Sequence, residues 1–272
     1  MLRNTFCHLP NVGIKTEKAF WRQGILDWED FLRQAEIQGS PGRIERLLPH
    51  VNSSLQELDK NNPEFFAEML PNQEKWRLFW EFSESTAYID IETTGTGKGL
   101  DHITTIALYD GNHVYTFVHG RNLEEFSDQI RDYGLVVTFN GACFDIPFIE
   151  KELGIVMPRA HIDLRFVLKS LGYKGGLKKC EHWFGLDRGN LDGVDGYWAV
   201  LMWSAFENTG DERILETLLA YNVEDVLSLE LLLCHAYNLK IADLPLDKKG
   251  VCLPSPGFNP YSAHGEIMER IG

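Results

Sequence analysis

The chain has 272 residues, of which 44% are hydrophobic and 12% aromatic, as expected of a folded protein with one large domain or one domain and a smaller one. Its formal net charge of −14 at pH 7 argues against a protein that coats nucleic acid by bulk attraction, but it does not exclude an acidic metal site that acts on nucleic acid. No apolar run is long enough to span a membrane and no signal peptide is evident, so we expect a cytoplasmic protein with no membrane contact.

The cysteines are odd in number, scattered and without a Cys-x-x-Cys pair, which predicts reduced thiols rather than a disulfide framework. Cys180 and His182 lie close together but have no second pair at zinc spacing, so a structural zinc site is not expected.

Residues 1–83 are predicted to form a helical N-terminal region. Within residues 5–35, a helix, a glycine-containing hairpin at 9–15 and further helices resemble the helix–hairpin–helix motif, whose hairpin amides contact phosphate. Unpaired amides next to Gly13 and Lys15 suit an anion on physical grounds as well. A hairpin that serves only for packing remains an equal alternative.

A strand is predicted at Thr86–Gly95, where the pattern changes from helical to extended. Side chains alternate along a strand, so Asp90 and Glu92 project from one face while Ile89 and Ile91 project from the other. Two adjacent carboxylates repel each other, and a divalent cation such as Mg²⁺ would remove the conflict. A pair of solvated acids on an exposed face is the alternative.

Further strands are predicted at 103–109, 114–118 and 135–139, with a hairpin turn between the first two and a helix at 123–133 before the third. Three adjacent strands followed by a helix and a strand indicate a mixed α/β sheet flanked by helices. After residue 240 the chain becomes rich in proline and glycine, and we expect an irregular tail over 241–272.

Two more stretches carry candidate acids. Asp145 stands at a strand-to-helix junction, where ligands bind in α/β sheets, although it would also serve as a helix N-cap. A strong amphipathic helix is predicted at 214–233, and its Tyr221 and Asp225 are four residues apart and therefore share a face. Taken alone, this pair also fits a boundary tyrosine and a surface acid.

Together the three stretches resemble the three motifs of the DEDD superfamily of 3′–5′ exonucleases, which has a ribonuclease-H-like fold. Asp90-Ile-Glu92-Thr-Thr-Gly95 resembles the first motif, Asn140 through Asp145 the second, and Tyr221 through Asp225 the third, in its tyrosine (DEDDy) subtype. The histidine subtype would carry its histidine at Ala220. The resemblance covers about residues 84–240, and the chain also resembles bacterial YprB-type ribonuclease-H-like proteins in combining this domain with a helix–hairpin–helix-like start.

The resemblance implies two divalent cations, Mg²⁺ or Mn²⁺, held by four acids. Asp90 would bridge the ions, Glu92 and Asp145 would complete their sites, and Asp225 would hold the ion that carries the attacking water. Tyr221 would orient that water, because a tyrosine with a pKa near 10 is a poor base at neutral pH.

The resemblance also implies substrate contacts. Thr93 and Thr94 stand where the family grips the sugar of the terminal nucleotide, and Phe139, Asn140 and Phe144 are candidates for sugar or base contacts. For these residues core packing and turn formation are equally good interpretations. Asp163 is expected to support the site without binding metal, and the basic stretch at residues 172–179 is a candidate for contacts to a strand backbone.

We therefore expect a metal-dependent 3′–5′ exonuclease that removes nucleoside 5′-monophosphates from the 3′ end of single-stranded DNA or RNA. The alternatives are a non-catalytic nucleic-acid-binding module, docked by the hairpin at residues 9–15, and an enzyme that hydrolyses small phosphoesters. The sequence does not distinguish DNA from RNA and indicates no protein partner.

Overall fold

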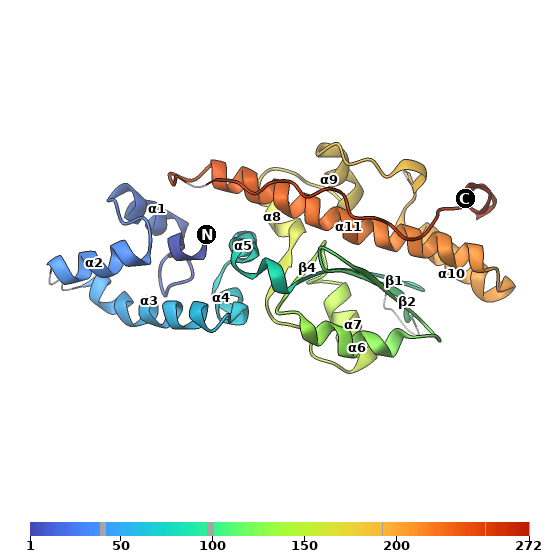
Figure 1. Cartoon of the computed structure of the whole chain (residues 1–272), viewed down its shortest axis with the longest axis horizontal. Coiled ribbons are helices and arrows are strands. Elements are labelled where there is room, and N and C mark those ends of the chain that lie inside the picture. The colour runs from blue at the N-terminus through green and yellow to red at the C-terminus, as the bar shows by residue number, and fades with distance from the viewer. Residues whose placement is uncertain (39–41, 97–100, 192, 248, 272) are drawn as a thin grey trace.

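A five-stranded mixed sheet organises residues 86–163 of the protein, described here from a computed structural model (Figure 1). The structure describes residues 1–38, 42–96, 101–191, 193–247 and 249–271. The strands are β1 (Thr86–Thr93), β2 (Ile103–Tyr109), β3 (Val114–Val118), β4 (Leu135–Thr138) and β5 (His161–Asp163). Their order is β3-β2-β1-β4-β5; β2 pairs antiparallel with both β1 and β3, whereas β4 pairs parallel with both β1 and β5. The predicted α/β fold with a mixed sheet is confirmed.

The first four strands lie where the sequence predicts them, but two details differ. In place of one helix over residues 123–133, the chain forms a 3-10 turn at Leu123–Glu125, the short helix α6 at Phe126–Gln129 and a second 3-10 turn at Ile130–Asp132. Strand β5 was not predicted, because three residues are too few to show an alternating pattern.

The two faces of the sheet are covered by different helices (Figure 1). Helix α11 (Glu212–Ala242) packs on β1 and β2 and shares a core with Tyr88 and Ala107. On the other face, Ile89 and Ile91 join the core beneath α6 and α7 (Asp145–Leu153). The alternation along β1 therefore places its even-numbered side chains under α11, as the strand period requires.

The remaining helices precede or follow the sheet in the chain. Those before the sheet are α1 (Ile14–Arg22), α2 (Trp28–Gln38), α3 (Arg43–Asp59), α4 (Pro63–Met69) and α5 (Phe79–Phe82), with a 3-10 segment at Asn72–Leu78. Those after β5 are α8 (Leu164–Ser170), α9 (Leu177–Trp183), α10 (Gly196–Thr209) and α12 (Gly265–Ile271). No helix in the described part of the chain has the length and apolarity needed to cross a membrane.

The N-terminal hairpin departs from the expected arrangement. Only a three-residue 3-10 turn, Leu2–Asn4, precedes the hairpin at residues 9–15, so the expectation of a helix on its N-terminal side was wrong. The segment is held instead by buried side chains: Trp21 and Trp28 donate hydrogen bonds to the carbonyl oxygens of Asn4 and Thr5. Phosphate binding by the hairpin stays a prediction.

The C-terminal tail runs along α11 (Figure 1). Asn259 Nδ2 donates to the carbonyl oxygen of Ala220 over 2.8 Å, and the hydroxyl groups of Tyr261 and Thr116 are 2.6 Å apart. The tail is irregular as expected up to the short helix α12, which the sequence did not reveal. All five cysteines are free.

Candidate active site

Strand β1 presents Asp90 and Glu92 to the face covered by α11. Their neighbours across the antiparallel pair are Ala107 and Thr105, whose small side chains leave space above the strand. Asp90 is partly buried and Glu92 is 9% exposed, so the two carboxylates do not form the solvated surface pair that was one of the alternatives.

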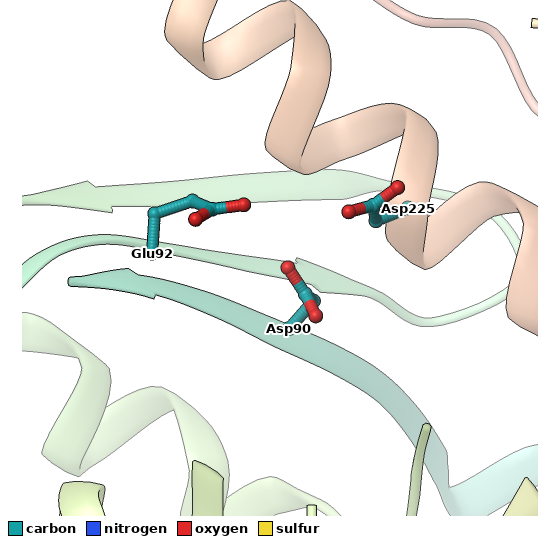
Figure 2. Close-up of side chains that lie close together, drawn as sticks. All are labelled: Asp90, Glu92 and Asp225. Carbon is teal, nitrogen blue, oxygen red and sulfur yellow. The ribbon is translucent and has the colours of Figure 1, made fainter. Parts of the chain in front are cut away.

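Helix α11 brings a third carboxylate to the pair. Oxygen atoms of Asp90, Glu92 and Asp225 all lie within 4.8 Å of one another, and Figure 2 shows the three groups directed toward a common point from β1 and α11. A cluster made of carboxylate oxygens alone is the donor set that hard divalent cations prefer. The arrangement therefore fits a divalent metal, and these three residues would hold it.

Asn222 fixes the position of Asp90 and was not foreseen from the sequence. Its Nδ2 donates to Asp90 Oδ2 over 2.8 Å, while its Oδ1 accepts a hydrogen bond of 3.0 Å from Thr105 Oγ1. Asn222 is fully buried, so one amide ties α11 to both β1 and β2 at the acidic cluster.

Burial and mutual repulsion raise the pKa of every acid in the site. Desolvation raises the pKa of Asp225 to about 6 and that of Asp145 to about 7. The pKa values of Asp90 and Glu92 are also raised well above their usual range, first by desolvation and then by Asp225 and the other carboxylates. Such a cluster favours either bound protons or a bound cation, which supports the interpretation as a metal site.

Asp145 lies at the start of α7, beside the cluster but outside the group of three. Its side chain does not cap the helix, whose N-cap residue is Phe144, so the alternative of a simple helix cap does not apply. Asp145 is 5% exposed, and its negative charge contributes to the raised pKa values of Asp90 and Glu92. Its role as a metal ligand stays a prediction.

The turn that delivers Asp145 is built around Asp163. Asn140 follows the end of β4 and has a φ of 69°, in the left-handed region that asparagine tolerates. Asp163 accepts hydrogen bonds from the backbone amides of Asn140, Ala142 and Arg165, at 2.8, 3.2 and 3.0 Å. Asp163 therefore shapes the loop before Asp145, which agrees with its expected supporting role.

Tyr221 is buried next to Asp225 and receives a hydrogen bond that the sequence did not predict. Lys178 Nζ donates to the Tyr221 hydroxyl over 2.6 Å and lies 4.5 Å from the centre of its ring. Since the ammonium group uses a lone pair of the phenol oxygen, the phenol hydrogen remains available to a second partner. Desolvation and the nearby Asp225 carboxylate raise the pKa of Tyr221, so it stays protonated at neutral pH.

Arg188 is the second unforeseen cation. Its guanidinium donates to both oxygens of Glu181 at 2.9 Å and also to Asp225 Oδ1. Arg188 and Glu181 are 8% and 1% exposed, so this is a buried ion-pair network that positions Asp225. Nothing in the local sequence around Arg188 distinguishes it from an ordinary surface arginine.

The candidate substrate residues are distributed around the cluster. Thr93 Oγ1 donates to the Gly95 carbonyl oxygen, and Thr94 Oγ1 accepts from the His102 amide, so both hydroxyl groups stabilise the end of β1. Phe139 and Asn140 line a cavity beside the site, whereas Phe144 packs against Phe148 with ring centres 5.6 Å apart. Contacts of these five residues with a substrate stay predictions.

Comparison with known proteins finds one matching family model and similar solved structures. The family model described as the RNase H superfamily matches residues 87–237, more than half of the chain. Among solved structures, the chain is similar to the family B DNA polymerase of the hyperthermophilic archaeon Pyrobaculum calidifontis (19% identity, TM-score 0.43), with 58% of this chain and 24% of that chain covered. It is also similar to the EXO domain of Aedes aegypti Nibbler (16% identity, TM-score 0.42), with 64% of this chain and 87% of that chain covered. The chain thus spans about a quarter of the polymerase, and no curated protein matches it in sequence.

Proposed function

The chain belongs to the RNase H superfamily, and from this premise we propose that it is a metal-dependent 3′–5′ exonuclease of the DEDDy type. Its substrate is single-stranded DNA or RNA, and its products are nucleoside 5′-monophosphates. We assign the nuclease domain to residues 84–240, preceded by the helical region 1–83 and followed by the tail 241–272.

The convergence of Asp90, Glu92 and Asp225 within 4.8 Å, on the sheet face beneath α11, carries the proposal. Asp145 supplies a fourth carboxylate from the adjacent α7, and its charge adds to the desolvation and the Asp225 charge that raise the pKa values of Asp90 and Glu92. When bound, two Mg²⁺ or Mn²⁺ ions supply the Lewis acidity that activates a water molecule and stabilises charge on the leaving oxygen.

The protein's own groups hold and orient the reactants. Asn222 keeps the Asp90 carboxylate in place, and Arg188 does the same for Asp225. Tyr221 donates its phenol hydrogen to the attacking water, since Lys178 already binds the phenol oxygen from the other side. An acidic site that must accept a terminal phosphodiester favours a single strand, because the last nucleotide has to leave its duplex partner.

The function is tested with matched 3′- and 5′-labelled single-stranded DNA and RNA, incubated with Mg²⁺, Mn²⁺ or EDTA. We expect a ladder that shortens from the 3′ end, requires the metal, and is absent with Asp225→Asn. The exposed Asp132→Asn is the matched control and should cut normally. Binding without cleavage under every metal condition would reject the proposal in favour of a non-catalytic binding module.

Tyr221→Phe tests the proposed orientation of the water. We expect the hydrolysis rate to fall by about 10- to 100-fold while the pH–rate profile keeps its shape, because the phenol does not titrate near neutral pH. The measurement is the initial rate at several pH values between about 6 and 9, a range that lies below even the ordinary tyrosine pKa. Loss of the rise in rate with pH, the limb that reports deprotonation of a general base, would identify Tyr221 as that base and contradict the orienting role.

A further inference from the structure

A cavity of about 530 Å³ opens beside the acidic cluster, within the size range of pockets that bind small ligands, about 300–1,000 Å³. It lies between the end of β4, helix α8 and the segment that leads into α9. The described residues that line it are Phe139, Asn140, Arg165, Lys169, Tyr173, Lys174, Gly175, Gly176, Leu177 and Cys180.

The lining is basic in a protein that is strongly acidic. The chain has 40 acidic and 26 basic residues, yet none of the described lining residues is acidic and three are basic: Arg165, Lys169 and Lys174. All three are exposed, so their charged ends reach solvent at the rim. A local cluster of cations on an acidic surface binds anions, and phosphodiesters are the anions that the proposed function brings to this place.

The cavity also offers an aromatic surface held in place by its neighbours. The ring of Tyr173 packs against Phe184 with ring centres 4.7 Å apart and against Trp183 at 6.1 Å. A fixed aromatic ring next to cations is the combination that binds single-stranded nucleic acid, since bases stack on the ring and phosphates pair with the cations.

Two residues connect the cavity to the acidic cluster. Asn140 lines the cavity and begins the turn that carries Asp145, and Arg165 donates to its side-chain oxygen. Leu177 lines the cavity and precedes Lys178, whose ammonium group binds the Tyr221 hydroxyl. A strand that leaves the acidic cluster along this side therefore enters the cavity directly.

We propose that this cavity is a subsite for a nucleotide upstream of the one being removed. Lys169, Lys174 and Arg165 bind its flanking phosphates, and Tyr173 stacks on its base. The inference rests on the proposed exonuclease function and extends it, because it gives the substrate strand a direction from the acidic cluster toward α8. The contacts are made to phosphate and to a base face, so they do not select a sequence.

The test measures binding separately from cleavage. A 5′-fluorescent oligothymidylate of about 12 nucleotides, a usual length for one single-strand site, is titrated with the Asp90→Asn protein in Mg²⁺, and anisotropy is recorded. Adding Lys169→Glu and Lys174→Glu should weaken binding by at least about tenfold and lower the slope of log K against log salt by about 1.4, at ~0.7 for each lost phosphate contact.

Matched variants separate the subsite from general charge effects. Arg131→Glu with Lys151→Glu changes the net charge equally on exposed residues away from the cavity, and should leave the affinity within about twofold. Tyr173→Ala should weaken binding by about tenfold, whereas Tyr173→Phe, which keeps the ring, should not. Circular dichroism confirms that each variant is folded.

The subsite is overturned if the cavity variants bind the oligonucleotide as tightly as the surface control does. That outcome can occur while the wild-type protein still digests DNA from its 3′ end, so it leaves the proposed function intact. Conversely, absent cleavage by the wild-type protein together with weakened binding by the cavity variants would reject the exonuclease and retain the nucleic-acid site.

Discussion

Replacing Asp90 by asparagine is expected to lower the rate of metal-dependent phosphodiester hydrolysis by at least about a thousandfold. The substitution keeps the shape of the side chain and an oxygen that accepts the hydrogen bond from Asn222 Nδ2, now 2.8 Å long. It removes one negative charge from the group formed with Glu92 and Asp225. The measurement is the single-turnover rate on a 3′-labelled strand, compared with that of the exposed control Asp132→Asn.

The same variant should make the metal-free protein more stable, which separates loss of chemistry from loss of fold. Desolvation and the neighbouring carboxylates raise the pKa of Asp90, so the ionised form of this group is costly in the folded state. Thermal unfolding in EDTA at pH 8 should therefore give a higher Tm for Asp90→Asn than for the wild type. A lower Tm would show that Asp90 serves the fold, and would contradict its assignment as an electrostatically strained metal ligand.

The pH dependence of the wild-type protein follows from the same cause. A carboxyl group whose pKa is higher in the folded than in the unfolded state holds its proton preferentially when folded. In EDTA the free energy of unfolding should accordingly fall as the pH rises. The fall begins at about pH 4, the ordinary carboxyl pKa, and continues through the raised pKa values of about 6 for Asp225 and about 7 for Asp145. Added Mg²⁺ should restore stability above that window, because the cation replaces the lost protons.

Arg77→Met is expected to lower the free energy of unfolding by about 3–5 kcal/mol, the usual cost of leaving a buried charge without its partner. Arg77 is 2% exposed and Glu17 is fully buried. The guanidinium donates to both oxygens of Glu17 at 2.9 Å and to Glu74 at 3.0 Å. The ion pair joins α1 to the 3-10 segment Asn72–Leu78, which also packs against α8 and β5.

A double-mutant cycle tests whether the unpaired charge is the cause. Glu17→Gln removes the partner charge, so in combination with Arg77→Met the loss should be smaller than the sum of the two single changes. Urea unfolding gives the free energies of the wild type, the two single variants and the double variant, and the exposed Arg131→Met serves as the control, with a change within about 0.5 kcal/mol. Simple additivity would show that Arg77 stabilises through packing on Trp76 and Trp21, whose rings lie 5.4 and 5.9 Å away, rather than through charge.

Part of the site could be predicted because its geometry is local. A period of two along β1 is enough to place Asp90 and Glu92 on one face, and a spacing of four along α11 is enough to align Tyr221 with Asp225. Both patterns hold wherever the strand and helix are finally packed. The adjacency of β2 and β3 also followed from the sequence, because the short turn at residues 110–113 joins them as a hairpin.

The tertiary structure alone decided which distant side chains bind the acids and Tyr221. Arg188 is 37 residues from Asp225, Lys178 is 43 residues from Tyr221, and Asn222 is 132 residues from Asp90. No periodicity links such distant positions, and the local sequence around a lysine or arginine is the same whether its side chain faces solvent or a buried acid. The packing of α11 across the sheet fixes these pairs. Attraction between charges is stronger in a buried site than at the surface, and a buried carboxylate without a partner is costly. The sequence by itself therefore determined the family, the sheet and the acids, whereas the fold determined how their charge is balanced and where a basic cavity opens beside them.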